Sequence, residues 1–211
     1  MVERPRIVTL DRWRTLCASL GAKNHDAEFE RLMRAWRSWG RRYHTLTHLA
    51  ACLIEFDEAR FLAQAPAEVE LALWFHDAVY RTWRADNELR SAEWAGRFVQ
   101  ETANAATAAR VRDLVLGTAH DAGLLEGDAA LVVDIDLSIL DRPAPEYDTF
   151  ETNVRREYWW VPRRRFSQAR CRILAAFLAR PFIYHWPPFR ERYESAARAN
   201  LERAMQALST A

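Results

Sequence analysis

The stretch ALWFHDAVY, at residues 72–80, places a histidine and an aspartate side by side at the end of an apolar run. Aspartate is almost never buried unless it is paired or bound to something, and an unpaired buried carboxylate is very costly to a fold. Because the run at residues 71–75 has the composition of a buried segment, we expect His76 and Asp77 to have partners elsewhere in the chain.

Apolar residues recur at helical spacing in almost every segment on both sides of this stretch. The expected helices cover residues 10–20, 25–39, 47–63, 67–77, a segment that opens at 86–88, 107–119, 128–140, 146–159, 167–178 and 189–208. No run alternates with a period of two, and the low glycine content favours helices. The sequence therefore predicts an all-α protein, a single-domain bundle of about nine to ten helices over residues 1–211.

Composition and charge narrow the class of protein. The net charge of +1 indicates neither nucleic acid nor an anionic membrane as a partner. Cys17, Cys52 and Cys171 are widely spaced and odd in number, which argues against a disulfide framework. The N-terminal segment lacks an apolar signal-peptide core, and no stretch approaches the roughly 18 apolar residues of a membrane span. We expect a soluble, cytoplasmic protein with no membrane partner.

His48 is the best partner for the His-Asp pair among the six histidines. On a helix, residues 48, 52 and 56 share a face, and because Cys52 and Phe56 are apolar, we expect His48 to point inward. His44 lies one turn earlier, and we expect it at the rim of a site. The alternative for a single inward histidine is a core residue with ordinary hydrogen bonds.

Two carboxylates stand among aliphatic side chains in VVDIDLSIL, residues 132–140. Residues two apart on a helix project about 200° apart, so only one of Asp134 and Asp136 can face the core. Asp136 shares its face with apolar side chains, whereas the face of Asp134 is more polar. We therefore expect Asp136 to be the buried one; the alternative is a salt bridge to one of the arginines.

Together, three helical segments supply His48, His76 with Asp77, and Asp136. Two histidines and two carboxylates suit a divalent ion such as Mn, Fe, Co, Ni or Zn, with Mg also a candidate, better than they suit a structural thiolate site. Four protein ligands leave positions open for water, whose pKa a metal lowers. We expect a divalent metal ion as the cofactor of a catalytic site.

A second His-Asp pair, His120-Asp121, ends a helix rather than a buried run. We expect this pair to be less buried than His76-Asp77. His120 is a candidate for an extra ligand, for a contact with phosphate or for proton transfer.

The order H…HD…D resembles that of the HD superfamily of metal-dependent phosphohydrolases, which are all-α proteins named for their ligands. The matching positions are His48, His76, Asp77 and Asp136. The wider pattern resembles a branch described only as predicted hydrolases, over about residues 30–205; it comprises YHTLTH at 43–48, WFHDAVY at 74–80, DNE at 86–88, SA at 91–92, TAH at 118–120, DIDLSIL at 134–140 and REY at 156–158. The resemblance implies a metal held by these four residues, with Asp77 also catalytic as the bridge between metal and water.

The sequence departs from the family pattern at Tyr80. Many relatives carry an acidic residue about one turn after the HD pair, where it orients or deprotonates the attacking water. Glu88 is the nearest substitute, and two interpretations stay open: a part in proton transfer, or a first-turn glutamate favoured by the helix dipole. We expect Tyr80 and His44 to contact the substrate.

Arginines and aromatic residues crowd one C-terminal segment. The arginines are Arg155, Arg156, Arg163, Arg164, Arg165, Arg170 and Arg172. A phosphorylated substrate needs cationic donors of this kind, and Arg156 is our candidate because it opens the family's REY motif. The alternative for the run is a solvated helix surface. We expect Trp159 and Trp160 in the core rather than stacked on a base.

We therefore expect an enzyme, a metal-dependent phosphohydrolase of phosphatase or nucleotidase type. A metal-bound hydroxide would attack a small phosphorylated molecule, a phosphomonoester or nucleotide. One alternative is a module that binds nucleotide or RNA, with a structural or vestigial metal site, although the low net charge weighs against RNA. Another is a helical scaffold, which requires four independent coincidences of buried polar residues.

Overall fold

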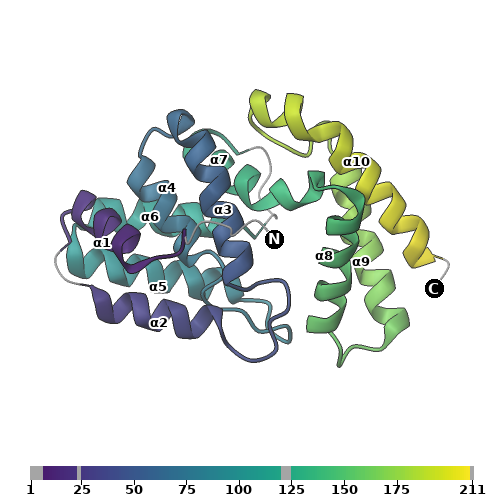
Figure 1. Cartoon of the computed structure of the whole chain (residues 1–211), viewed down its shortest axis with the longest axis horizontal. Helices are drawn as coiled ribbons and strands as arrows, with labels where there is room; N and C mark the ends of the chain where they lie inside the picture. The colour runs from purple at the N-terminus through teal and green to yellow at the C-terminus, as the bar shows by residue number, and fades with distance from the viewer. Residues whose placement is uncertain (1–6, 23–24, 120–124, 210–211) are drawn as a thin grey trace. The chain divides into compact units, whose positions relative to one another are not determined.

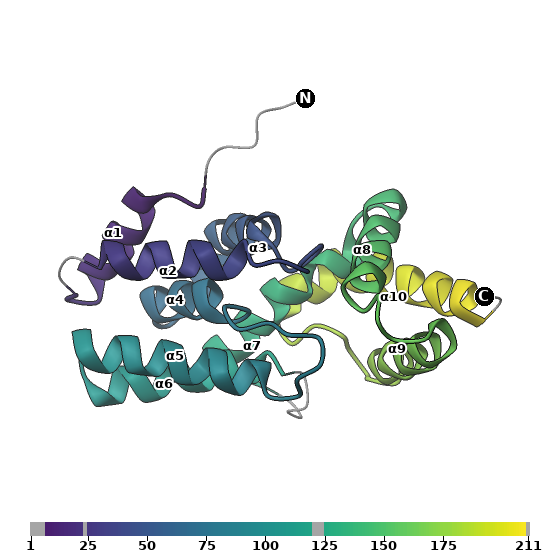
Figure 2. The same ribbon diagram turned by 90° about the horizontal axis from the view of Figure 1, so that it is seen from below.

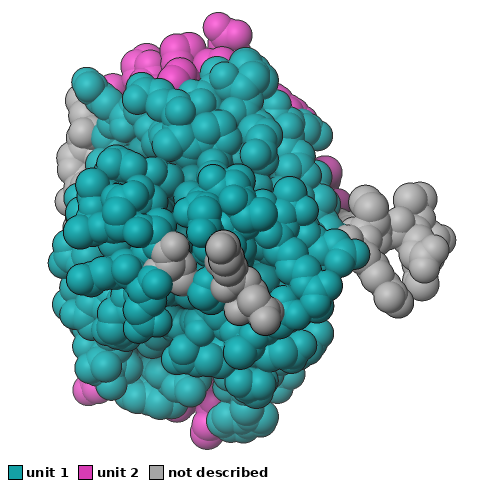
Figure 3. All heavy atoms as spheres, turned by 90° about the vertical axis from the view of Figure 1, so that its left-hand side faces the viewer, with its two compact units in different colours: residues 1–136 teal, residues 137–211 magenta. Residues whose placement is uncertain are grey.

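The computed structural model describes residues 7–22, 25–119 and 125–209 (Figure 1). This described part contains ten α-helices and no strand, so the all-α prediction is confirmed. The chain divides into two compact units, Met1–Asp136 and Leu137–Ala211, which have separate colours in Figure 3. The expectation of one domain over the whole chain stays a prediction. No helix in the described ranges combines the length and apolarity needed to cross a bilayer.

Unit 1 contains seven of the α-helices in the described residues. They are α1 (Leu10–Ser19), α2 (Asp26–Trp36), α3 (Leu46–Ala59), α4 (Pro66–Phe75), α5 (Asn87–Thr102), α6 (Ala105–Gly117) and α7 (Gly127–Asp136). A short 3-10 helix, η1 (Arg60–Leu62), extends α3. Helices α5 and α6 lie side by side as a hairpin (Figure 2).

Helix α4 is the central helix of unit 1. It packs against α1, α3, α5, α6 and α7, and all of its residues from Glu68 to Phe75 are buried. Fully burying one large apolar side chain stabilises a fold by about 1.5–3 kcal/mol, so this helix is a major part of the core. Because α4 is enclosed, the His-Asp pair that follows Phe75 emerges inside the unit.

The two glutamates of α4 are buried and paired. Glu70 accepts hydrogen bonds from Arg12 at 2.7 Å and from Arg60 at 2.9 Å. Glu68 accepts two hydrogen bonds from Arg110. The carboxylates of Glu68 and Glu70 are therefore already bound by arginines. Neither these carboxylates nor their arginines are available as partners for the His-Asp pair at the end of α4.

Unit 2 contains the 3-10 helix η2 (Leu137–Asp141) and three α-helices, α8 (Ala144–Glu157), α9 (Arg163–Leu178) and α10 (Pro187–Ser209). Helix α10 packs against both η2 and α9. Asn200 on α10 donates to the carbonyl oxygens of Leu140 and Arg142, both at 2.8 Å. This amide satisfies carbonyl groups at the end of η2 that have no further helical turn to bond to.

The prediction that Trp159 and Trp160 lie in the core is wrong. Their exposed fractions are 67% and 46%. Helix α8 ends at Glu157, and the guanidinium of Arg155 then donates to the carbonyl oxygens of Tyr158 and Val161. Trp159 and Trp160 therefore lie in the turn after α8, where the helical periodicity used for the prediction no longer applies.

Candidate metal centre

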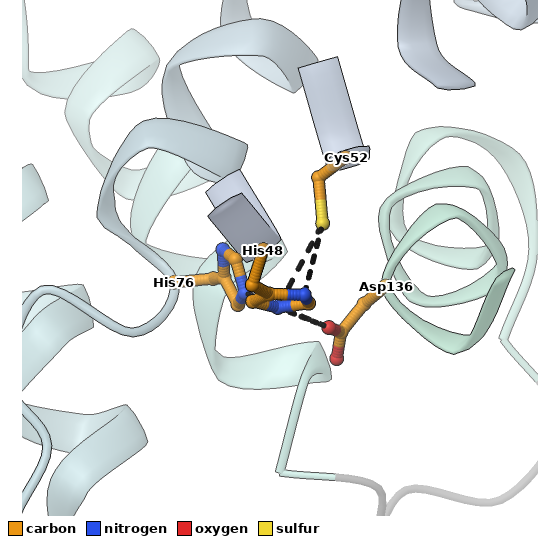
Figure 4. A group of neighbouring side chains, drawn as sticks. All are labelled: His48, Cys52, His76 and Asp136. Carbon is orange, nitrogen blue, oxygen red and sulfur yellow. Dashed lines mark hydrogen bonds and ion pairs between the residues drawn. The ribbon is translucent and has the colours of Figure 1, made fainter. Parts of the chain in front are cut away.

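Three segments of unit 1 bring four polar side chains together. His48 lies in the first turn of α3, His76 and Asp77 directly follow α4, and Asp136 is the last residue of α7. The side chains of His48, His76 and Asp136 converge in Figure 4. Each of the four positions therefore stands at a helix end, where the side chain can leave the packed face of its helix.

The donor atoms of these residues are separated by short distances. The Nε2 atoms of His48 and His76 are 3.0 Å apart. The Asp136 Oδ1 atom lies 3.1 Å from the His48 Nε2 and 3.5 Å from the His76 Nε2. The Asp77 Oδ2 atom lies 3.3 Å from the His76 Nε2 and 3.7 Å from the His48 Nε2.

These separations match the geometry of ligands around one transition-metal ion. With metal–ligand bonds of about 2.0–2.2 Å, two donors lie about 3.0 Å apart at a right angle and about 3.4 Å apart in a tetrahedron. All five separations, from 3.0 to 3.7 Å, are close to these values. Imidazole and carboxylate ligands suit Mn, Fe, Co, Ni or Zn. The cluster could therefore hold a metal ion.

The imidazole of His76 is oriented by its own helix. Its Nδ1 donates to the carbonyl oxygen of Leu73 at 2.8 Å, because a carbonyl oxygen can only accept. The backbone N–H of His76 also donates to the carbonyl oxygen of Ala72 at 2.8 Å. These bonds direct Nε2 toward the cluster, which is the usual arrangement of a ligating histidine with its second ring nitrogen held.

The two imidazoles differ in their tendency to hold a proton. Burial lowers the pKa of His48, although contact with Asp136 opposes this. Burial also disfavours a charge on His76, but the carboxylates of Asp77 and Asp136 outweigh it and raise the pKa of His76 well above its usual value. Burial would raise the pKa of Asp77, yet His76 and the other histidines hold it well below its usual range. In a metal-free cluster these contacts favour a proton on His76 over one on His48 and favour the ionised form of Asp77.

Cys52 is a cluster member that the sequence pattern had placed only among apolar residues. The ligand atoms of His48, Cys52, His76 and Asp136 lie within 4.8 Å of one another (Figure 4). The Cys52 Sγ atom is 3.7 Å from Nε2 and 3.8 Å from Nδ1 of His48, so the sulfur lies over the ring rather than along the Nε2 lone pair. Burial raises the pKa of Cys52. In the sequence, the signal for this proximity is that Cys52 follows His48 by four residues, which places both on one face of the helix.

Arg41 is a second residue that the sequence did not identify, because nothing local distinguishes it from Arg42. Its side chain is buried and donates to the carbonyl oxygens of His44 at 2.9 Å, Asp77 at 2.9 Å and Ala78 at 3.1 Å. The guanidinium thus ties the segment before α3 to the backbone of the His-Asp pair.

His44 and Tyr80 lie beside the Asp77 carboxylate of the cluster. Helix α3 begins at Leu46, after His44. The His44 and Tyr80 rings are stacked, with centroids 4.0 Å apart. The His44 Nε2 atom is 4.0 Å from the Asp77 Oδ2 atom. The stacked pair therefore borders the carboxylate, and its contact with substrate stays a prediction.

The backbone that follows the His-Asp pair is held by the start of α5. The Ser91 hydroxyl accepts from the backbone N–H of Val79 at 3.0 Å. The Asn87 amide accepts from the backbone N–H of Arg81 and donates to its carbonyl oxygen, both at 3.0 Å. The DNE and SA parts of the sequence pattern thus have a structural role in this loop.

Three predicted site residues stay predictions. Glu88 lies in the first turn of α5, a position that agrees with its helix-dipole interpretation. His120 lies outside the described residues. Arg156 is exposed in the last turn of α8 and belongs to unit 2, whereas the cluster belongs to unit 1.

The assignment of burial between the two aspartates is wrong, although Asp136 does reach the cluster. Asp134 is fully buried, whereas the side chain of Asp136 is 15% exposed. Helix α7 is buried on all sides from Ala130 to Ile135, so a polar face cannot be assigned from spacing alone. The α-helix also ends at Asp136 and continues as η2, which breaks the expected periodicity.

Comparison of the chain with protein-family models, with curated proteins and with solved structures finds no match.

Proposed function

We propose that the protein is a metal-dependent phosphohydrolase of the HD type that acts on a phosphomonoester or nucleotide. The observation that supports this most is that the Nε2 atoms of His48 and His76 are 3.0 Å apart and that one oxygen each of Asp77 and Asp136 lies 3.1–3.7 Å from both of them. Their order in the chain resembles that of the HD superfamily. A divalent ion held by these residues would lower the pKa of water and offset charge on a phosphoryl oxygen.

Access to the site is from the side of the carboxylates. The side chains of His48 and His76 are 3% and 1% exposed, whereas those of Asp77 and Asp136 are 14% and 15% exposed. Because the two imidazoles are buried, they can bind an ion, but a substrate from solution cannot contact them directly. Water and a phosphoryl group therefore reach the centre beside Asp77 and Asp136.

Asp77 has a second task in this proposal. Its pKa is lowered, so the carboxylate is ionised at neutral pH, and it is able to accept a hydrogen bond from an attacking water. The neighbouring His44 and Tyr80 rings would contact the substrate at the rim. Glu88 or His120 would assist proton transfer, and Arg156, in unit 2, stays a candidate for a contact with phosphate on the basis of the sequence motif alone.

The test begins with the metal content of untagged protein, measured by elemental mass spectrometry. We expect about one transition-metal ion per wild-type chain and none in Asp77→Ala or His48→Ala. Asp113→Ala is the matched control, since Asp113 is an exposed aspartate on α6 and should leave the metal content unchanged. Circular dichroism checks that each variant is folded.

Turnover is then measured on phosphomonoesters and nucleotides in the metal that was found. We expect wild type and Asp113→Ala to release phosphate, and Asp77→Ala to be inactive. Phosphate release by folded, metal-free Asp77→Ala would contradict the proposal. Nucleotide binding that survives chelation, without any turnover, would instead favour the binding module.

A further inference from the structure

Positive charge is concentrated in unit 2. Residues 137–211 contain 13 arginines, no lysine and 8 aspartates or glutamates, a net charge of +5 in a chain whose total is +1. A local excess of this size on a small unit creates a field that attracts anions. The arrangement of the arginines without ion pairs then indicates which kind of anion unit 2 could bind.

Most of the carboxylates near α9 already have an arginine partner. Glu151 pairs with Arg170 at 2.7 Å, and Asp148 pairs with Arg203 at 2.8 Å. Arg155 is bound to backbone carbonyl oxygens at the end of α8. These arginines have structural roles and are not free to bind a ligand.

Arg163, Arg164 and Arg172 on α9 differ from these neighbours. All three side chains are exposed, and within the described residues none of them has an ion pair or hydrogen bond. They line a hollow of about 770 Å³, together with Ser167, Gln168 and Ser209. Within the described part of the chain, no aspartate or glutamate lines this hollow.

The position of two of these arginines on the helix is unfavourable in the absence of an anion. Arg163 and Arg164 begin α9, whose first turn contains no acidic residue. Cations are disfavoured at a helix N-terminus, and adjacent guanidinium groups repel each other. An anion bound in the hollow would offset both the unfavourable position of the cations at the helix N-terminus and the repulsion between the two guanidinium groups.

We propose that this hollow on α9 binds a small anion that carries at least two phosphoryl groups. Each guanidinium offers paired N–H donors that match two phosphate oxygens, and three arginines can share more than one phosphoryl group. Ser167, Gln168 and Ser209 add neutral donors at the same wall. The volume lies within the range of about 300–1,000 Å³ that is usual for small-molecule sites.

The limited extent of the hollow, about 770 Å³, favours a small molecule over a polymer or a bilayer. Single-stranded nucleic acid is normally held by a groove that follows the backbone, with aromatic side chains that stack on the bases. An anionic membrane surface is normally recognised by clusters of about four to eight lysines or arginines. The three arginines line one hollow along α9, so we expect an anion with two or more phosphoryl groups to contact them together.

The test is a titration of inorganic tripolyphosphate into metal-stripped wild-type protein by calorimetry. Arg172→Ala and the double variant Arg163→Ala/Arg164→Ala are expected to weaken binding about tenfold or more, as removal of charge-assisted hydrogen bonds does. Arg165→Ala is the matched control, because Arg165 lies in the same exposed turn but does not line the hollow. It is expected to change the dissociation constant by less than about twofold.

Three results would overturn this proposal. One is a wild-type dissociation constant above about 1 mM. Another is equal weakening by Arg165→Ala and Arg172→Ala, which would indicate diffuse attraction. The third is binding of single-stranded RNA or anionic phosphatidylserine vesicles through these arginines while tripolyphosphate does not bind. Asp77→Ala should bind tripolyphosphate as wild type does, so this test does not depend on the metal centre.

Discussion

The His76 Nδ1 atom lies 2.8 Å from the carbonyl oxygen of Leu73, within the last turn of α4. This single contact links the core of unit 1 to the proposed chemistry. A buried helix fixes the backbone, the backbone carbonyl fixes the imidazole, and the imidazole presents Nε2 to the cluster. The His-Asp pair therefore follows an apolar run because the run is what positions it.

Metal binding is expected to release about one proton per ion near pH 7. The carboxylates beside His76 raise its pKa, so the metal-free ring is protonated there, and a ligating imidazole must be neutral. Apparent affinity should rise about tenfold per pH unit below that pKa and level off above it. Calorimetry in two buffers of different ionisation enthalpy counts the protons. A count of zero at pH 7 would mean that the two imidazoles are already neutral.

Asp77 rather than Cys52 is expected to complete the ligand set. Asp77→Ala should weaken metal binding by at least about 100-fold, whereas Cys52→Ala should change it by less than about tenfold, since the sulfur lies over the His48 ring. Cobalt(II) substitution gives a direct readout. A sulfur-to-cobalt absorption band in wild type that disappears in Cys52→Ala would reverse this assignment.

The sequence predicts most of what depends on local periodicity and little of what depends on tertiary contact. The helices and the inward direction of His48 follow from apolar spacing, and the burial of α4 follows from the apolar composition of residues 71–75. The burial of Asp134 does not, because a helix that is enclosed on all sides has no polar face to detect. Trp159 is exposed in the turn after α8, where Arg155 donates to the carbonyl oxygens of Tyr158 and Val161. The spacing of apolar residues does not predict such side-chain-to-backbone hydrogen bonds.

Asn87→Ala is expected to loosen the backbone after the His-Asp pair. The variant loses two hydrogen bonds to the backbone of Arg81, and the buried groups left unsatisfied should cost about 1–3 kcal/mol of unfolding free energy. Urea unfolding measures this cost. Asn153→Ala is the control, because Asn153 belongs to unit 2 and this loop to unit 1. An equal loss in both variants would contradict a specific role for Asn87.

Arg41→Ala is expected to damage both stability and the metal centre, whereas Arg42→Ala should do neither. Arg41 is buried and donates to the carbonyl oxygens of His44, Asp77 and Ala78, so its loss leaves these acceptors without their charged donor and should cost about 2–4 kcal/mol. Arg42 is exposed, and its replacement should stay within about 0.5 kcal/mol. Metal affinity should fall about tenfold in Arg41→Ala. It should recover partly in Arg41→Lys, which restores a charged donor but not the planar guanidinium that can bond several carbonyl oxygens at once. Unchanged metal affinity in a destabilised Arg41→Ala would show that Arg41 supports the fold without positioning Asp77.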